Sequence, residues 1–387
     1  MERDIPAARL RPGLFVVSAG QGTFEDPILR IGRVVESDAE VQRILATGAD
    51  TIRIDEARSR SGQPEAAQQP LPGDGCALED QAEAFTARLR ILSRSYAQAL
   101  KAMHHVLEDV RLRRDFDPAP LEEPLDDMVA RAFGSPDCAV CLTVIHHSGR
   151  LAEHSVNVAL LAAAFGSHLG LTRAKAKTIA AAGMFHDIGK ILVERNILNK
   201  PGRLNVEEFR AVKRHPSVGC LMLSGKGLNP LIPRMVLEHH ERVDGSGYPQ
   251  GLRYDEVSPF SRIISLADAY DAMTSQRPYK PALSPDKALR VMHRDRGAYF
   301  GASELDGFIR FLGATPPGSL VRLADGHHGV VLVSGGNGAA PLVRIVLDRR
   351  MRPIHSRVGF AGGPDMPSVA ECLCAAREGV NVERFLA

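Results

Sequence analysis

The sequence has little excess charge, few cysteines and no long apolar run, and each shortage excludes a class of protein. A formal net charge of +2 over 387 residues gives no electrostatic case for a nucleic-acid polymer or an anionic membrane as a partner. No segment reaches the ~18 apolar residues of a membrane span, and residues 1–6 lack the apolar core of a signal peptide. Six cysteines in so long a chain do not make a disulfide framework. We therefore expect a soluble cytoplasmic protein with reduced thiols.

The first part of the chain predicts a small module followed by a linker. Residues 1–56 carry short apolar runs bounded by Gly and Pro, which predicts a small α+β module. Its expected elements are strands at 14–17, 28–31 and 51–54 and a short helix at 41–45. Residues 57–75 are polar and rich in Pro, Gly and Gln, so they predict a flexible linker with little to bury.

The rest of the chain predicts a helical core and a β-rich end. Long Ala-, Leu- and Val-rich segments predict a mostly helical domain over residues 119–314. Residues 315–387 are expected to form a small β-rich appendage. Its expected strands lie at 321–323, 330–333 and 342–347. The predicted fold class is a multidomain protein with a helical core between an α+β module and this appendage.

Between the linker and the core, residues 76–118 predict a connecting helix with an apolar seam. Nine apolar residues alternate spacings of three and four: Ala82, Phe85, Leu89, Leu92, Tyr96, Ala99, Met103, Val106 and Val110. About four heptads is the minimum for a coiled coil. The seam therefore indicates either a homodimer through residues 82–110 or an amphipathic helix that lies on its own domain. The sequence leaves both interpretations open.

The core contains imidazoles and carboxylates in patterns typical of a metal site. His186 and Asp187 stand side by side at the end of an apolar helical run, and His239 and His240 precede a glycine-rich turn. Neighbours on a helix point about 100° apart, so His186 and Asp187 would reach a site from different directions. The two oxygens of the Asp187 carboxylate could bridge two ions.

Three further residues complete the candidate set of ligands. His154 and Asp268 lie on an earlier and a later predicted helix, and His215 adds another imidazole. Helices that face a common interior are how helical bundles build metal sites. The remaining histidines are interpreted as structural or solvent-exposed, because a single histidine on a helix is seldom a ligand. The combination of motifs, and no single histidine, carries the prediction.

A charge count indicates what such a site could bind. Two divalent ions contribute about +4 and two aspartates about −2, so the site keeps about +2 when the imidazoles are neutral. That surplus suits an anionic ligand such as a phosphodiester, and coordination makes water a better nucleophile. The mixed nitrogen and oxygen ligands favour Fe or Mn, with Zn also possible, over Ca or Mg.

These motifs together resemble the HD-GYP family, the bacterial cyclic di-GMP phosphodiesterases within the HD phosphohydrolase superfamily. Residues 186–190 read HDIGK, residues 239–249 read HHERVDGSGYP, and residues 277–279 read RPY. The resemblance covers roughly residues 119–314. It implies an all-helical domain that hydrolyses cyclic di-GMP to the linear dinucleotide pGpG, and in some members on to GMP.

The resemblance also implies roles for individual residues. His154, His186, Asp187 and Asp268 would form the quartet common to HD enzymes, and His215, His239 and His240 would hold a second ion, with Asp187 bridging. Lys190 falls on a lysine that contacts phosphate, and together with Asp187 it is the implied catalytic residue. Arg277 and Lys280 fall near the substrate phosphates or bases, where a guanidinium can fork two oxygens. Tyr248 either stacks on a guanine or packs its loop, and packing is favoured.

One residue limits what the resemblance implies, and a second resemblance concerns the first part of the chain. Some family members carry a glutamate, associated with a third metal, one helical turn before the first ligand histidine, and here that position is Arg150. We therefore expect two metals, and Arg150 argues against complete hydrolysis to GMP without excluding it. Residues 1–56 are similar to a small domain often found ahead of HD-GYP domains, for which we expect regulation or dimerisation.

Two alternatives to the leading function stay open. One is another HD-type phosphohydrolase, acting on a different cyclic dinucleotide or on a nucleotide phosphate. The other is a signalling adaptor without catalysis, which would bind the GGDEF domains of diguanylate cyclases through its GYP loop.

Overall fold

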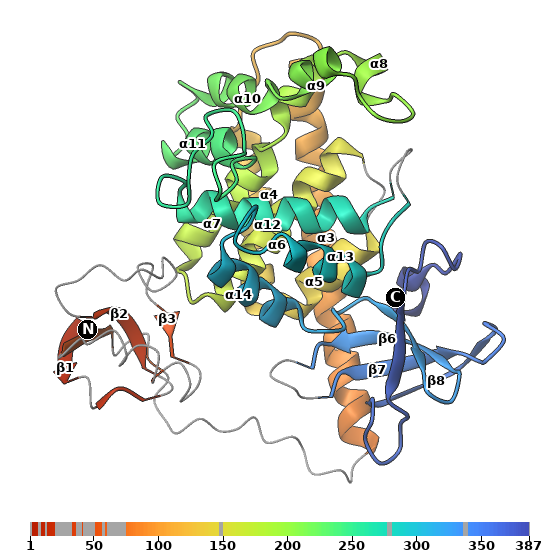
Figure 1. The fold of residues 1–387 in the computed structure, drawn as a ribbon. Helices are drawn as coiled ribbons and strands as arrows, with labels where there is room; N and C mark the ends of the chain where they lie inside the picture. Colours follow the sequence, from red (N-terminus) through yellow and green to blue (C-terminus); the bar gives the residue numbers. More distant parts are fainter. Residues whose placement is uncertain are drawn as a thin grey trace. The chain divides into compact units, whose positions relative to one another are not determined.

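The chain forms two compact units, which are described separately. The first comprises residues 1–73 with 166–172, and the second comprises residues 74–165 with 173–387 (Figure 1). The computed structural model describes residues 2–6, 9–11, 14–19, 33–35, 41, 51–55, 59, 75–146, 150–276, 281–335 and 340–386.

The first unit contains a four-stranded antiparallel sheet in the order β1-β4-β2-β3. The strands are β1 (Glu2–Pro6), β2 (Phe15–Ala19), β3 (Arg33–Val34) and β4 (Thr51–Asp55). Ile5, Val16, Ile52 and Ile54 belong to its small core. The strands expected near 14–17 and 51–54 are confirmed. The strand expected at 28–31 and nearly all of the linker and of the helix at 41–45 lie outside the described residues.

Helix α3 (Gly75–Arg111) corrects the coiled-coil interpretation. All nine seam residues are buried within this single chain. The helix packs against α4 (Glu122–Gly134) and α5 (Pro136–Ile145), and a strand of the C-terminal sheet also contacts it. The alternative of an amphipathic helix on its own domain is therefore right. The seam at residues 82–110 is not free to form a dimer, because its own domain already covers it.

The helical core follows α3 and confirms the helical expectation for the central block (Figure 1). After η2 (Ala119–Leu121), α4 and α5, its elements are α6 (Leu151–His168), α7 (Arg173–Phe185), η3 (Ile188–Leu192), α8 (Arg195–Leu198), α9 (Val206–Val212), α10 (His215–Leu223), α11 (Leu231–Glu238), α12 (Pro259–Thr274), α13 (Pro285–Arg294) and α14 (Ala302–Leu312). Small residues let α6 and α7 approach closely, since a Cβ on Gly183 would lie 3.1 Å from the backbone of Ala159. This close approach brings the start of α6 and the end of α7 into one interior.

The C-terminal part forms a five-stranded antiparallel sheet in the order β8-β7-β6-β5-β9. Its strands are β5 (Leu320–Leu323), β6 (His328–Val333), β7 (Leu342–Leu347), β8 (Pro353–Phe360) and β9 (Val369–Leu373), and the turn η5 (Val382–Phe385) follows. The three expected strands are confirmed. The sequence analysis missed β8 and β9, because most of their side chains are not buried and they show no apolar run.

A membrane span finds little support among the described helices. No single one is long and apolar enough to cross a bilayer. Residues 119–134 and 136–145 pass the test of length and composition only as a pair, and that pair is bent by 117°. Six consecutive residues of its second helix, 138–143, are buried in the protein.

The burial of the α3 seam predicts a contrast between two neighbouring residues. Leu92 is 1% exposed and Ile91 is 44% exposed. We expect Leu92→Ala to lower the free energy of unfolding by about 2–5 kcal/mol, because it opens a cavity in the core. Ile91→Ala should change it by no more than about 0.5 kcal/mol.

Urea unfolding followed by helical circular dichroism measures both changes. The midpoint should not depend on protein concentration. A midpoint that rises with concentration, together with a large loss for Ile91→Ala, would instead indicate a dimer through this helix.

Candidate metal centre

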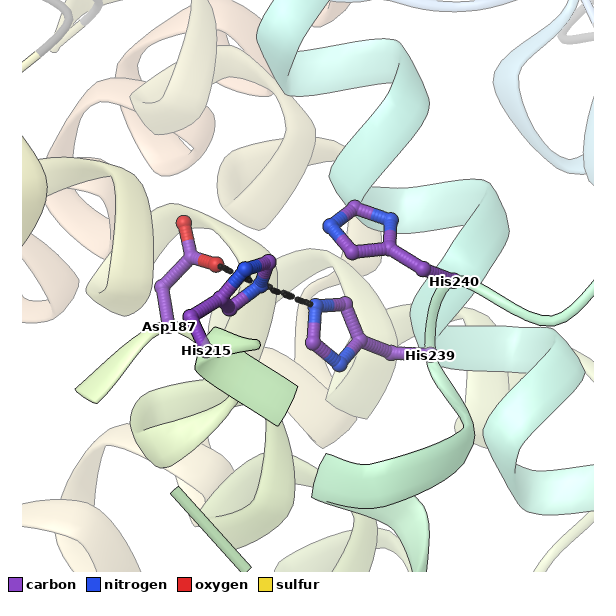
Figure 2. A group of neighbouring side chains, drawn as sticks. All are labelled: Asp187, His215, His239 and His240. Atoms are coloured by element: carbon purple, nitrogen blue, oxygen red, sulfur yellow. Dashed lines mark hydrogen bonds and ion pairs between the residues drawn. The ribbon is translucent and has the colours of Figure 1, made fainter. Parts of the chain in front are cut away.

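The seven side chains expected to be metal ligands converge inside the second unit. His154 lies on α6, Asp268 lies on α12 and His215 begins α10. The other four directly follow the ends of α7 and α11: His186, Asp187, His239 and His240. Their ligand atoms form two groups, and within each group all the atoms lie within 4.8 Å of one another. Figure 2 shows the first group, and the second comprises His154, His186 and Asp268.

Asp187 lies between the two groups and offers one carboxylate oxygen to each. Its Oδ1 lies 3.1 Å from Nε2 of His215 and 3.8 Å from Nε2 of His239. Its Oδ2 lies 3.3 Å from Nε2 of His186 and 3.7 Å from Nε2 of His154. This arrangement suits a carboxylate that bridges two cations.

Asp268 also contacts both groups. Its Oδ1 lies 3.0 Å from Nε2 of His154 and 3.8 Å from Nε2 of His186. Its Oδ2 lies 3.9 Å from Nδ1 of His240, which belongs to the first group. The centre therefore combines two carboxylates with five imidazoles, a donor set that suits first-row transition metals.

Three of the imidazoles are oriented by the same local hydrogen bond. In each, Nδ1 contacts the carbonyl oxygen three residues earlier: His186 to Gly183 at 2.7 Å, His215 to Val212 at 2.8 Å and His239 to Val236 at 2.7 Å. A carbonyl oxygen only accepts, so Nδ1 carries the proton and Nε2 of a neutral ring presents a lone pair. Orientation of a ligand imidazole by such a second bond is typical of metal sites.

The resulting atom positions fit bound cations. Nε2 of His215 and Nε2 of His239 face each other at 3.2 Å (Figure 2). When both rings are neutral these lone pairs repel, and a cation beside them removes the conflict. Nε2 of His186 and Oδ1 of Asp187 are buried without a hydrogen-bond partner among the described residues, although buried polar atoms are normally paired.

The two aspartates of the centre are held in the anionic form. Burial raises the pKa of Asp187, but His186 and Lys190 outweigh it and hold this pKa well below its ordinary value. For Asp268, burial is likewise outweighed by His154 and His186, and the pKa is again well below its ordinary value. Anionic carboxylates are the form that binds cations.

The imidazoles differ in how readily they take up a proton. Burial and the neighbouring histidines lower the pKa of His239 well below its ordinary value, and burial lowers that of His240 to about 3. Burial also opposes protonation of His154, but the carboxylates of Asp268 and Asp271 raise its pKa to about 9. A cation at Nε2 of His154 would take the place of that proton.

His154 is oriented by side chains that the sequence analysis missed. Its Nδ1 donates to Oδ2 of Asp271 at 2.6 Å, and Oδ1 of Asp271 accepts from Nδ2 of Asn157 at 2.8 Å. Asn157 follows His154 by three residues on α6, and Asp271 follows Asp268 by three residues on α12. Residues three apart share a helix face, so this spacing is the signal that could have found them.

The turn η3 supplies Lys190 and fixes the start of α10. Nζ of Lys190 donates to Oδ2 of Asp187 at 2.6 Å. Gly189 has no room for a side chain, because a Cβ there would collide with the carbonyl oxygen of His215. The glycine in the HDIGK motif thus allows the backbone of η3 to lie directly against the first residue of α10.

The GYP loop packs on the centre. The ring of Tyr248 lies 4.8 Å from that of His240 between centroids, at an interplanar angle of 37°. The buried carboxylate of Glu241 accepts from the backbone N–H of Gln250 at 2.6 Å and of Leu252 at 2.9 Å. These two bonds hold the loop in place, and Tyr248 contacts a ligand imidazole as the packing interpretation expects.

An aromatic and cationic surface lies beside Tyr248. Nζ of Lys213 lies 4.8 Å from the ring centroid of Phe209 and 5.2 Å from that of Tyr248. The side chain of Phe209 is 46% exposed. Exposed rings next to ammonium groups suit a ligand that carries both bases and phosphates.

The sequence analysis singled out three further residues. Arg277 and Lys280 lie outside the described residues. Arg150, at the position associated with a third metal, is exposed just before α6. Among the described residues, the two groups above are the groups of three or more His, Cys, Asp and Glu side chains close enough to hold an ion.

Comparison with protein families agrees with this organisation. A model described as "HD domain" matches residues 141–303. A model described as "Domain of unknown function (DUF3391)" matches residues 2–121.

Three curated relatives are similar over different lengths. The cyclic di-GMP phosphodiesterase PA4108 of Pseudomonas aeruginosa is 33% identical over 377 residues, which cover 94% of this chain and 91% of that protein. The cyclic di-GMP phosphodiesterase response regulator RpfG of Xanthomonas campestris is 41% identical over 37% of this chain and 38% of its own length. The 3'3'-cGAMP-specific phosphodiesterase 3 of Vibrio cholerae is 37% identical over 46% of this chain and 38% of its own length.

The shared position of Asp187 predicts that both ions depend on it. We expect about two Fe or Mn ions per chain in anaerobically purified protein and almost none in Asp187→Asn, which keeps the volume but removes the charge. Asp244→Asn alters an exposed carboxylate of the GYP loop and should keep both ions. Elemental analysis measures the ratio. Retention of both ions by Asp187→Asn would refute the bridging role, and about three ions in the unaltered protein would refute the two-metal interpretation.

The contact of Gly189 predicts a second loss of metal. Gly189→Ala should push the backbone of His215 away and weaken metal binding by about 10–100-fold, the range seen when support for a ligand is removed. Gly134→Ala is the control, because no atom lies within 4 Å of a Cβ at that position. Titration with Mn²⁺ compares the two variants, and equal affinities would show that the close approach at Gly189 is unimportant.

Proposed function

This chain belongs to the HD-GYP family of the HD phosphohydrolase superfamily, and from that premise we propose that it is a metal-dependent phosphodiesterase that hydrolyses cyclic di-GMP to linear pGpG. Its relative PA4108 carries the name of such an enzyme and aligns with nearly the whole of this chain. The proposed role is in second-messenger signalling.

The observation that carries the proposal is the carboxylate of Asp187 between two groups of imidazoles. Its two oxygens lie 3.1 Å from His215 and 3.3 Å from His186. A pair of divalent cations at these residues would leave a surplus of positive charge, because only two carboxylates are among the candidate ligands. A phosphodiester is the anionic group that such a pair binds and cleaves.

The residues of the centre then have distinct proposed roles. The bound cations would polarise the phosphoryl oxygens and lower the pKa of the attacking water. Asp187 holds the two ion sites together, and Lys190, which is partly exposed, would move from Asp187 toward the charge that develops on the phosphoryl oxygens. Arg277 and Lys280 are proposed to bind the substrate phosphates or bases, and Tyr248 to brace His240.

The proposed product is the linear dinucleotide. The position associated with a third metal is Arg150, and its positive charge would repel a further cation. We therefore propose two transition metals, Fe or Mn, or else Zn, and hydrolysis that ends after the first bond.

A different cyclic dinucleotide is the second candidate substrate. The observation in its favour is the 37% identity to a 3'3'-cGAMP-specific phosphodiesterase. The described part of the centre would hold metal ions and act on the substrate phosphates, and the phosphates are common to both substrates. The bases must therefore be read by other groups, among which the surface of Phe209 and Lys213 is a candidate.

The remaining assignments concern the organisation of the chain and its partners. We propose residues 1–56 as a regulatory module, residues 57–75 as its linker and residues 315–387 as an appendage to the phosphodiesterase domain. A complex with a GGDEF domain through the GYP loop stays a prediction. The complete set of ligand residues favours an enzyme over an adaptor, since an adaptor needs no such set.

The proposal predicts a specific product and a role for Lys190. Metal-loaded protein should convert cyclic di-GMP to pGpG, as detected by chromatography. Lys190→Met should keep its metals and lose about 10²–10³-fold in kcat, because it removes a charge that acts on the transition state. Lys226→Met is the control, since that ammonium is bonded to Asp115 and Phe116, and its rate should match the unaltered protein.

The outcomes separate the candidate functions. A faster reaction with 3'3'-cGAMP than with cyclic di-GMP would favour the second substrate. Protein that carries both metals and yields no linear product from either would overturn the enzyme proposal.

A further inference from the structure

We propose that Tyr96, on α3, is a positioning residue for the metal centre, acting through Asn157 and Asp271 on the ligand His154. The inference rests on the metal centre described above and makes α3 part of the catalytic unit. It needs no assumption about the substrate.

A continuous chain of hydrogen bonds connects these four residues. The hydroxyl of Tyr96 donates to Oδ1 of Asn157 at 2.9 Å, Nδ2 of Asn157 donates to Oδ1 of Asp271 at 2.8 Å, and Nδ1 of His154 donates to Oδ2 of Asp271 at 2.6 Å. All four are buried, and they come from three different helices, α3, α6 and α12. Residues far apart in the sequence thus hold one imidazole.

The chemistry of each group fixes the direction of every bond. The carboxylate of Asp271 only accepts, so His154 Nδ1 and the amide nitrogen of Asn157 both donate to it. The carbonyl oxygen of His146 also accepts from that nitrogen, so both amide hydrogens are used. The amide oxygen is left for Tyr96, whose pKa is raised by burial and by nearby Asp271, so its hydroxyl stays protonated and donates.

The direction of these hydrogen bonds leaves Nε2 of His154 able to bind a metal ion. With the proton at Nδ1, the Nε2 lone pair of His154 faces Asp187 and Asp268. Loss of the Tyr96 hydroxyl would leave a buried amide oxygen without its donor, and Asn157 could then rotate away from Asp271. The ring of Tyr96 would stay in place, since it stacks on His146 with centroids 4.7 Å apart.

Tyr96→Phe tests this role because it removes only the hydroxyl. We expect the full-length variant to fold and to bind one of its two Mn²⁺ ions about tenfold more weakly, at the low end of what loss of an outer partner of a ligand costs. Asp271→Asn, which acts on His154 directly, should weaken the same ion more. Titration with Mn²⁺ followed by electron paramagnetic resonance measures the two affinities without substrate.

Tyr270→Phe is the matched control. Tyr270 is equally buried and lies on the same helix as Asp271, but its hydroxyl has no hydrogen-bond partner among the described residues. It should bind both ions like the unaltered protein. If Tyr96→Phe bound both ions normally, or if Tyr270→Phe lost as much affinity, the positioning role would be refuted.

A double-mutant cycle distinguishes this path from a general structural effect. If Tyr96 acts through Asn157, the loss caused by Tyr96→Phe should disappear when Asn157 is already Ala. Additive losses would mean that Tyr96 supports the centre by another route. Because the readout is metal affinity, either result stands whether or not cyclic di-GMP proves to be the substrate.

Discussion

The constraint on which the second unit depends is the convergence of imidazole nitrogens and carboxylate oxygens in a buried interior. Nε2 atoms that face one another at 3.2 Å repel, and a buried polar atom without a partner is costly. Cations held by these residues would relieve the repulsion and would give the unpaired atoms a partner. The surrounding helices hold these atoms close to one another against that repulsion.

The ligands stand at helix ends and on helices that cross closely, and this is why they can converge. Adjacent residues inside a helix point about 100° apart, so His186 and Asp187 on a continuing helix would face different neighbours. Because α7 ends at Phe185, the backbone turns and both side chains reach the same interior. His239 and His240 follow the end of α11 in the same way. Close backbone contacts at Gly183 and Gly189 then fix the end of α7 and the turn η3 against α6 and α10.

Some of the candidate ligands are oriented by hydrogen bonds to nearby residues, and His154 is oriented by a residue far away in the sequence. His186, His215 and His239 are oriented by carbonyl oxygens three residues earlier, which any fold that keeps the helix end will supply. His154 depends on a carboxylate from another helix, and through it on α3. His154 is therefore a candidate ligand that α3, an element outside the central block, can influence.

The sequence by itself determined the chemistry of this protein and the type of most of its elements. The sequence named all seven side chains that the structure brings together as candidate metal ligands, because they stand in dense motifs or at positions that match a family pattern. The strands of residues 321–347 were found, because their side chains are apolar and buried. Only the tertiary structure decided that the seam of α3 is covered by its own domain, because a periodic apolar face does not say which surface will cover it. The spacing of three residues marks Asn157 and Asp271 as lying on the same helix faces as His154 and Asp268. Only the tertiary structure joined Tyr96 to Asn157 and Asn157 to Asp271, because these hydrogen bonds connect residues 61 and 114 positions apart.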